Sequence, residues 1–472
     1  MPGFLCREGM QVRRSMFTLA AAATAVLPAV AVAQEERPAY VRALAAGYKA
    51  GFLCSNLFNG GLSEAQTEAD DLRGTYENLS PLLAGLPAQV DRERRMVSVT
   101  YDPVMPPRVA VWRPLLGCAQ LPIGATAEAV TTLPRINAKA PDLDASAWPM
   151  GDRGAIGRAS GDPRALAGTI AGAFDRRSYG QGSETTAVLV VQNGRIVAER
   201  YRPDLDMHSS QRTWSVGKSL AASVIGAAVQ QRLIDVDAPA PVPEWKAVGD
   251  PRGRITTDQL LRMASGLNSD HAGNRTDALY FGGVGVAHQA AGWPLVAPPG
   301  TAFRYANNDT VLTIRGLQHA LGDGERSLRF PFEALLWKVG MTRTVPETDW
   351  RGHFVMSSQV WTTARDLARL GLLHLNDGLW NGERVLPAGW RDYVRRHGPA
   401  QPASGYGYGA SWWTFQQGSG LPTDAIVARG NRGQYLVVVP SRQLVVVRRG
   451  FDGNGMAFDL DAFTRDLLAA LG

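Results

Sequence analysis

Two β-hairpins that lie far apart in the sequence place the strongest constraint on the fold. In the first, the runs TTAVLVVQ and RIVAERY are joined by Asn193-Gly194, the dipeptide most typical of a tight hairpin turn. The second, GQYLVVVPSRQLVVVRR, turns between Pro440 and Gln443. Strands joined by such short turns are antiparallel, and helical patterns fill much of the segment between the hairpins. The sequence therefore predicts an α+β fold in which one antiparallel sheet is flanked by helices.

Composition and local patterns divide the chain into parts. Its 472 residues, 45% hydrophobic and 19% charged, are enough for two globular domains. Residues 34–134 combine a helical pattern around Cys54 with the strand patterns RRMVSVTYDP and PRVAVWRP, and predict a small N-terminal α+β domain. Residues 135–161 are rich in Pro, Gly, Asp and Ala without periodicity, which indicates a linker. Residues 162–472 form the main domain, which opens with the helical pattern RALAGTIAGAFD and ends in a helix from about Ala457 to Leu471.

The first 33 residues are typical of a secretory signal peptide. Two adjacent arginines precede an apolar run, residues 16–32, and the small residues AVA stand directly before Gln34. A membrane-spanning helix is the alternative, but Pro28 interrupts a run of only about 17 residues, at the lower limit for crossing a bilayer. We therefore predict cleavage before Gln34, a periplasmic or secreted protein, and no integral membrane segment after cleavage. Sec and twin-arginine export both stay open.

Cysteine usage agrees with export. The mature chain retains two cysteines, Cys54 and Cys118, and an oxidising compartment allows them to pair. Their disulfide would close a loop of about 65 residues and stabilise the fold by about 3 to 4 kcal/mol if loop entropy dominates. Two buried free thiols are the alternative interpretation. We favour the disulfide Cys54–Cys118.

Charge and histidine patterns argue against nucleic-acid and metal binding. The net charge is +6, but only 5 of the 49 basic residues are lysines, and the arginines are scattered rather than clustered. A nucleic-acid surface needs a basic stripe or run, so we predict no nucleic-acid partner. The seven histidines show no metal-ligand spacing. We therefore expect no metal.

The stretch TWSVGKSLAASVIGAAVQQ contains a serine and a lysine three positions apart, Ser215 and Lys218. If a helix starts near Ser215, both side chains lie on one face, a turn apart. A lysine can take the proton of a serine hydroxyl when burial lowers the lysine pKa. The alternative is an N-cap serine followed by an unrelated lysine. Lysine is scarce here, and the apolar helix after Lys218 is expected to be buried, so we favour the catalytic interpretation.

Two further stretches carry candidate site residues. In APPGTAFRYANNDTVL, Tyr305 and Asn307 follow a Pro-Gly turn and precede a helical run. Tyr305 could relay protons there, and Asn307 could hold an ammonium or a substrate carbonyl; packing and turn formation are the alternatives. In ARGNRGQYLVVVP, Gly430 and Gly433 are expected to begin a strand, where a backbone amide could bind an oxyanion. A glycine bulge without such a function is the alternative.

The order of these motifs resembles the serine β-lactamase and penicillin-binding superfamily. Ser-x-x-Lys is followed 90 residues later by Tyr-x-Asn and a further 125 residues later by the glycine-rich turn. The class C type serine hydrolases, which include carboxylesterases and 6-aminohexanoate-dimer hydrolases, are the most similar branch. The stretches RITTDQLLRMASGL and ARDLARLGLLHLNDGLWNGERVLPAGW support the resemblance, which covers about residues 144–472.

The resemblance implies a role for each candidate residue and no cofactor. Ser215 would be the acylated nucleophile, Lys218 its base, and Tyr305 the proton shuttle to the leaving group and from water. Asn307 would orient Lys218 or the substrate. The oxyanion hole would consist of the backbone N–H groups of Ser215 and Asn431.

One departure from the family pattern concerns the substrate. Many relatives have Lys-Thr-Gly or His-Thr-Gly where this chain has Ala428-Arg429-Gly430. Strand alternation would place Arg429 on the other face from the missing cation, although Arg432 could still reach in. Efficient β-lactam hydrolysis is therefore not expected.

We therefore predict an exported serine hydrolase that forms an acyl-enzyme with a small ester or a linear amide. Two alternatives stay open. One is a D,D-peptidase or β-lactamase that acts on peptidoglycan-type or β-lactam substrates. The other is a non-catalytic binding protein that retains the fold.

Overall fold

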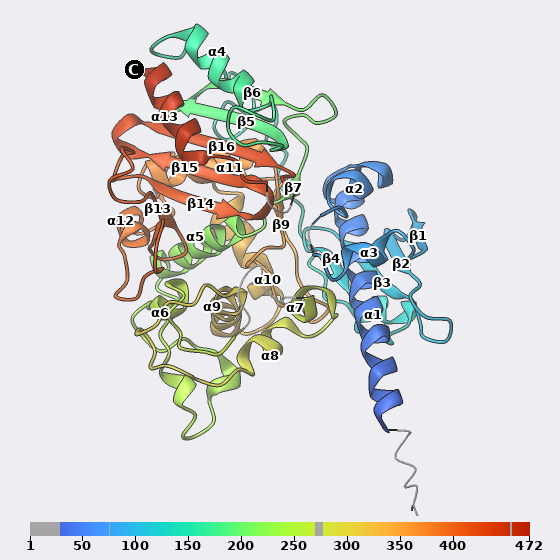
Figure 1. Cartoon of the computed structure of the whole chain (residues 1–472). Helices are drawn as coiled ribbons and strands as arrows, with labels where there is room; N and C mark the ends of the chain where they lie inside the picture. Colours follow the sequence, from blue (N-terminus) through green and yellow to red (C-terminus); the bar gives the residue numbers. More distant parts are fainter. Residues whose placement is uncertain (1–28, 75, 270–276, 454–455) are drawn as a thin grey trace, which may run out of the picture.

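The central feature of the protein is a seven-stranded antiparallel sheet. The computed structural model describes residues 29–74, 76–269, 277–453 and 456–472. The strand order is β12-β13-β14-β15-β16-β5-β6, and helices lie on both sides of the sheet (Figure 1). This confirms the predicted α+β fold. The strands are β5 (Thr185–Gln192), β6 (Arg195–Tyr201), β12 (Gly407–Tyr408), β13 (Trp413–Thr414), β14 (Ile426–Gly430), β15 (Gln434–Val439) and β16 (Leu444–Gly450).

Both faces of the sheet are buried, so its inner strands contain continuous apolar runs, such as Val188–Val191 on β5 and Leu444–Val447 on β16. Successive residues of a strand face opposite sides, and on β5 Val188 and Leu189 belong to two different core clusters. Each face therefore has its own helical layer. The layer beside Val188 contains α4 (Pro163–Gly172) and α13 (Leu460–Leu471), and the layer beside Leu189 contains α5 (Val216–Gln230) and α11 (Ala364–Leu375).

Both predicted hairpins are present. Asn193 and Gly194 have φ angles of 50° and 76°, the left-handed conformation that a two-residue hairpin turn requires. Strands β15 and β16 are joined by the short 3-10 turn Pro440–Arg442. Because β16 pairs with β5, the two hairpins form one continuous sheet.

The predicted helices are also present, with one boundary moved. The C-terminal helix starts at Leu460 rather than near Ala457. Asp459 caps it, because its carboxylate accepts a hydrogen bond from the backbone N–H of Ala462. The residues before this cap therefore stay outside the helix.

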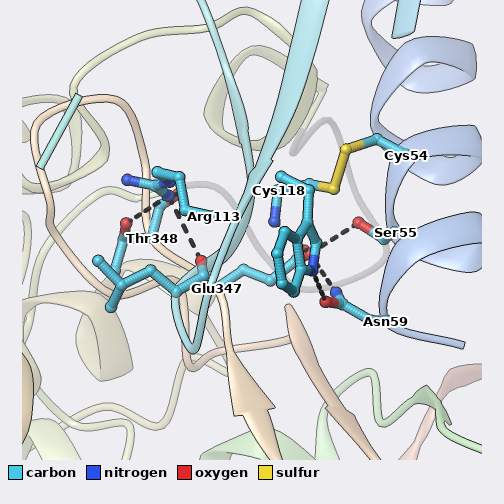
Figure 2. The surroundings of a disulfide bond; sticks show 9 residues. Cys54, Ser55, Asn59, Arg113, Cys118, Glu347 and Thr348 are labelled. Carbon is cyan, nitrogen blue, oxygen red and sulfur yellow. Dashed lines mark hydrogen bonds between the residues drawn. A yellow bond between two sulfur atoms is a disulfide. The ribbon is translucent and has the colours of Figure 1, made fainter. Parts of the chain in front are cut away.

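The segment before the sheet domain folds as a helix packed on a small antiparallel sheet, which we refer to as the N-terminal unit. Helix α1 contacts β2, β3 and β4, and the disulfide Cys54–Cys118 joins α1 to β4 (Figure 2). The unit therefore contains the predicted strands and the predicted cysteine pair. Its elements are α1 (Ala29–Phe58), α2 (Glu64–Asp70), α3 (Ser80–Leu83), β1 (Ala88–Asp91), β2 (Met96–Val99), β3 (Arg108–Arg113) and β4 (Gly117–Gln120).

The signal peptide stays a prediction. Residues 1–28 lie outside the described residues, and α1 starts at Ala29, ahead of the predicted cleavage before Gln34. Among the helices that the structure describes, none combines the length and the apolar character that crossing a bilayer requires.

The N-terminal unit and the sheet domain share one hydrophobic cluster. Phe52 of α1 lies 6.0 Å from Trp214 and 6.5 Å from Phe281 between ring centroids. The predicted linker, residues 135–161, is fully described and contains no helix or strand. The two units are therefore in direct contact through side chains, in addition to their covalent connection through residues 135–161.

Shorter elements complete the sheet domain, some of them where the chain enters α5. Strands β7, β9 and β8 form a small sheet there, and β7 leads directly into the turn before α5. The remaining elements include β7 (Gln211–Arg212), β8 (Val345–Pro346), β9 (Val360–Thr362), α6 (Thr257–Leu261), α7 (Asp277–Phe281), α8 (Val286–Ala291), α9 (Asn307–Ala320), α10 (Glu325–Pro331) and α12 (Trp390–Arg395).

Candidate active site

Ser215 lies at the start of the buried helix α5, but it does not act as a helix cap. Its side chain makes no capping hydrogen bond, so the interpretation of Ser215 as an N-cap serine is wrong. Trp214, the preceding residue, has a φ of 50°, an unfavourable conformation for a bulky side chain. Ser215, which follows this strained turn, is partly exposed.

Lys218 is fully buried and makes three polar contacts. Its Nζ lies 3.0 Å from Ser215 Oγ, 2.6 Å from Asn307 Oδ1 and 2.8 Å from the carbonyl oxygen of Ser357. The amide oxygen and the carbonyl oxygen can only accept hydrogen bonds, so Lys218 donates a hydrogen bond to each. A neutral amine then has its lone pair left for the Ser215 hydroxyl. The geometry therefore suits removal of the proton from Ser215 Oγ.

Electrostatics favours the neutral form of this lysine. Burial, and next the positive charge of Arg212, lower the pKa of Lys218 from 10.5 to about 7. The helix after it is buried from Val216 to Ala228, as predicted. An amine near half-ionisation at neutral pH can both take up and release a proton.

Tyr305 lies beside this pair with its phenol protonated. Its ring centroid is 5.0 Å from Lys218 Nζ, and its ring packs against Tyr408 and Trp413. Burial raises the pKa of Tyr305 to about 12, although the Ser215 side chain, the charge of Arg429 and Trp413 act in the opposite direction. Tyr305 is therefore a proton donor near neutral pH.

Asn307 reaches the site because it is the first residue of α9. Its side chain is 2% exposed, and its Oδ1 accepts the shortest of the Lys218 hydrogen bonds. The sequence motif Tyr-x-Asn thus brings both Tyr305 and Asn307 to Lys218, on either side of Ala306.

The glycine-rich turn also meets the nucleophile, but its strand differs from the prediction. Gly430 ends β14 rather than beginning a strand, and Asn431–Gly433 form the turn into β15. The apolar residues before Gly430 form the strand, and left-handed backbone at Arg432 and Gly433 reverses the chain. A Cβ on Gly430 would lie 2.4 Å from the Thr213 carbonyl oxygen and 3.1 Å from the Ser215 nitrogen.

Only a glycine allows this approach of the two backbones. Asn431 follows directly and is exposed. The structure therefore brings the main chain of Ser215 next to the strand end that carries Asn431, the two positions from which oxyanion amides were predicted.

Arg432 does not reach into the site. Its guanidinium is buried and donates to the carbonyl oxygens of Phe451 and Asp452 at 3.0 and 3.2 Å. The expectation that Arg432 could reach in to replace the cation missing before Gly430 is therefore wrong. The left-handed backbone at Arg432, with φ at 59°, turns its side chain into the protein core.

Two features of the site were not found from the sequence. The Ser357 carbonyl comes from a loop far from Lys218 in sequence and carries no side-chain signal. Arg212 stands three residues before Ser215 and stacks between Trp214, at 3.9 Å, and Phe52, at 4.8 Å. A buried arginine close to the nucleophile was visible only as one scattered arginine among many.

In the described ranges, no three histidine, cysteine, aspartate or glutamate side chains gather as a metal-ligand set.

Comparison with known proteins identifies the family. Residues 170–466, more than half of the chain, match the model of the Beta-lactamase family. The chain belongs to this family. It is a serine hydrolase, and the predicted relationship to the β-lactamase and penicillin-binding superfamily is confirmed. The chain is also 27% identical to the 6-aminohexanoate-dimer hydrolase of Paenarthrobacter ureafaciens over an alignment of 297 residues, which covers 56% of this chain and 72% of that enzyme.

Solved structures show the same fold at low sequence identity. A family VIII carboxylesterase matches with a TM-score of 0.52 and 17% identity, covering 66% of this chain and 98% of the esterase. A penicillin-binding protein homologue from Caulobacter crescentus matches with a TM-score of 0.53 and 15% identity, covering 66% and 98%. About a third of this Beta-lactamase family member therefore lies outside the alignment with either protein.

Proposed function

We propose that this protein is an exported serine hydrolase that cleaves a small ester or a linear amide through an acyl-enzyme on Ser215. The contact of the buried Lys218 amine with the Ser215 hydroxyl is the observation that carries the proposal. Asn307 and the Ser357 carbonyl hold that amine in place, and burial lowers its pKa to about 7, so that a large fraction is neutral near neutral pH.

Acylation begins when Lys218 Nζ takes the proton of Ser215 Oγ. The oxygen forms a bond to the substrate carbonyl carbon, and the carbonyl electrons move onto its oxygen. The backbone N–H groups of Ser215 and Asn431 stabilise this oxyanion. When the intermediate collapses, the bond to the leaving alcohol or amine breaks, and the leaving group receives the proton from Lys218 by way of Tyr305.

Deacylation reverses these roles. As a water molecule attacks the acyl carbon, it gives one proton to Tyr305 while Tyr305 passes its own proton to Lys218. When the bond between the acyl carbon and Ser215 Oγ breaks, Lys218 returns that proton to Ser215 Oγ and the acid leaves. Tyr305 suits such a relay because its high pKa keeps the phenol protonated between transfers. No cofactor is needed at any step.

The substrate class follows from the missing cation before Gly430. Relatives with a lysine or histidine there can hold a substrate carboxylate, whereas this chain has Ala428, and the Arg432 side chain is buried elsewhere. The similarity to a 6-aminohexanoate-dimer hydrolase and the fold shared with a carboxylesterase favour a linear amide or an ester over a β-lactam.

A fluorophosphonate probe tests the nucleophile. Mass spectrometry should locate the label on Ser215, and Ser215→Ala should abolish hydrolysis of short-chain nitrophenyl esters. Unchanged turnover in Ser215→Ala would contradict the proposal. A panel of esters, linear oligoamides, amino-acid amides and nitrocefin, with the same variant as control, identifies the substrate class, and preferred turnover of nitrocefin would favour a β-lactamase instead.

Export rests on the signal-peptide pattern of residues 1–33 and on the disulfide Cys54–Cys118. Protein recovered from the periplasm or the medium should begin at Gln34 by N-terminal sequencing. Recovery of the uncleaved chain in the cytoplasm alone would contradict this part of the proposal.

A further inference from the structure

Asp71 is a buried carboxylate of the N-terminal unit that is held in a fixed position. It follows α2 directly, and its side chain is 2% exposed. Asn56 Nδ2 donates to Asp71 Oδ2 at 2.9 Å, and the Tyr48 hydroxyl donates to the Asp71 carbonyl oxygen at 2.7 Å. Both partners lie on α1, so the long helix fixes this carboxylate.

The carboxylate faces Arg432 of the sheet domain. Arg432 Nη1 lies 3.5 Å from Asp71 Oδ1, and both side chains are almost completely buried. Arg432 also donates to the Phe451 and Asp452 carbonyl oxygens. Of these three groups, the carboxylate is the one that the N-terminal unit supplies.

The Arg432 backbone adjoins the candidate oxyanion hole. Arg432 follows Asn431 directly, its φ is 59°, and Gly430 on the other side of Asn431 approaches the Ser215 nitrogen. A residue in such a conformation stays there only when its surroundings hold it. Movement of the Arg432 guanidinium would therefore shift the Asn431 N–H relative to Ser215.

The N-terminal unit also contacts the sheet domain at two further places, one of them just before the nucleophile in sequence. Phe52 of α1 packs against Arg212, three residues before Ser215. Glu347 of the sheet domain accepts hydrogen bonds from Ser55 and Asn59, at 2.7 and 2.8 Å, beside the disulfide (Figure 2). These contacts limit any movement of α1 relative to the catalytic residues.

We propose that Asp71 is a positioning residue for catalysis, and that through Arg432 it fixes the turn whose Asn431 amide binds the oxyanion. The N-terminal unit then completes the active site of the sheet domain. This inference rests on the proposed function of Ser215. Asp71 lies outside residues 170–466, the part of the chain that matches the family model, whereas Arg432 lies inside it.

Asp71→Asn tests the proposal. It removes the charge that holds Arg432 and leaves a side chain of the same size. With a nitrophenyl ester, kcat should fall about 10- to 100-fold while KM changes less than about threefold, since a misplaced oxyanion donor weakens transition-state binding. The rate of Ser215 labelling by a fluorophosphonate should fall as well, because its P=O oxygen uses the same amides.

Asp70→Asn is the matched control. Asp70 is the neighbouring residue and also joins the two units, through an ion pair with Arg202 at 2.6 Å. Arg202 follows β6 and lies outside the turn that carries Asn431. This variant should leave the kcat of the folded protein within about twofold of wild type.

Arg432→Lys keeps the buried positive charge. It provides a second test of the proposal in case Asp71→Asn does not fold. It should lower kcat without a comparable fall in the melting temperature, because an ammonium cannot reproduce the fork of contacts. Asp71→Asn combined with Arg432→Lys should be no slower than the slower single variant, because both act on one turn.

Three outcomes separate the possibilities. If wild type neither hydrolyses esters nor is labelled on Ser215, the proposed function fails. If wild type is active but Asp71→Asn and Arg432→Lys both retain wild-type kcat, the positioning role is refuted. Equal losses of kcat in Asp70→Asn and Asp71→Asn would also refute it, because the unit would then act only through overall stability.

Discussion

The low pKa of Lys218 predicts a steep acid limb in the pH profile. A pKa of about 7 in place of 10.5 leaves about three quarters of Lys218 neutral at pH 7.5, against about one in a thousand for an ordinary lysine. At pH 5 the neutral fraction is about 1%. If neutral Lys218 is the base, kcat/KM should therefore fall about 75-fold from pH 7.5 to pH 5.

The assay is the initial rate of nitrophenyl ester hydrolysis from pH 5 to pH 9, corrected with Ser215→Ala at each pH. Arg212 supplies a direct check, because its charge lowers the pKa of Lys218 after burial has done so. Arg212→Gln should move the midpoint to higher pH, whereas Arg212→Lys should leave it in place. A profile that is flat between pH 5 and pH 8, or that rises toward acid, would refute the assignment of Lys218 as the base.

Two further predictions concern the turn at the site and the disulfide. Gly430→Ala should lower kcat at least about tenfold, because the new Cβ would lie 2.4 Å from the Thr213 carbonyl oxygen. Circular dichroism should show that the variant is folded. A wild-type kcat would show that the two backbones can separate without loss of activity. Loss of the disulfide in Cys54→Ala/Cys118→Ala should lower the free energy of unfolding in urea by about 4 kcal/mol, given a separation of 64 residues. An unchanged urea midpoint would contradict the entropic estimate.

The features that could be predicted from the sequence depend on short-range patterns. The turn at Asn193-Gly194 needs left-handed backbone, which these two residues tolerate, so the hairpin was evident locally. The contact of Ser215 with Lys218 follows from helical spacing alone. Asn307 needed the family motif as well, because 89 residues separate it from Lys218.

The features that were missed depend on packing between distant segments. Alternation along a strand could not show that Arg432 turns into the core, because its direction is set by the left-handed turn and by the carbonyl oxygens it meets. The Ser357 carbonyl has no side-chain signature. Nothing in the N-terminal sequence suggested that Asp71 would lie within reach of the catalytic turn.

Buried arginines around the nucleophile connect these findings. Arg212 precedes Ser215, Arg432 follows Asn431, and Arg449 of β16 donates to the carbonyl oxygens of Arg212 and Gln211, which lead into the nucleophile turn. The positive charge of Arg212 favours a neutral Lys218, and positive charge around the nucleophile favours an anionic transition state.

Burying these positively charged arginines lowers the free energy of unfolding unless carboxylates lie near them. Asp71 contacts Arg432, and its negative charge also acts on Arg449, so the N-terminal unit offsets part of this cost. Neutralising Asp71 should therefore affect catalysis and stability through the same arginines. The measurement that separates the two effects is kcat per labelled Ser215, which counts only molecules with an intact site.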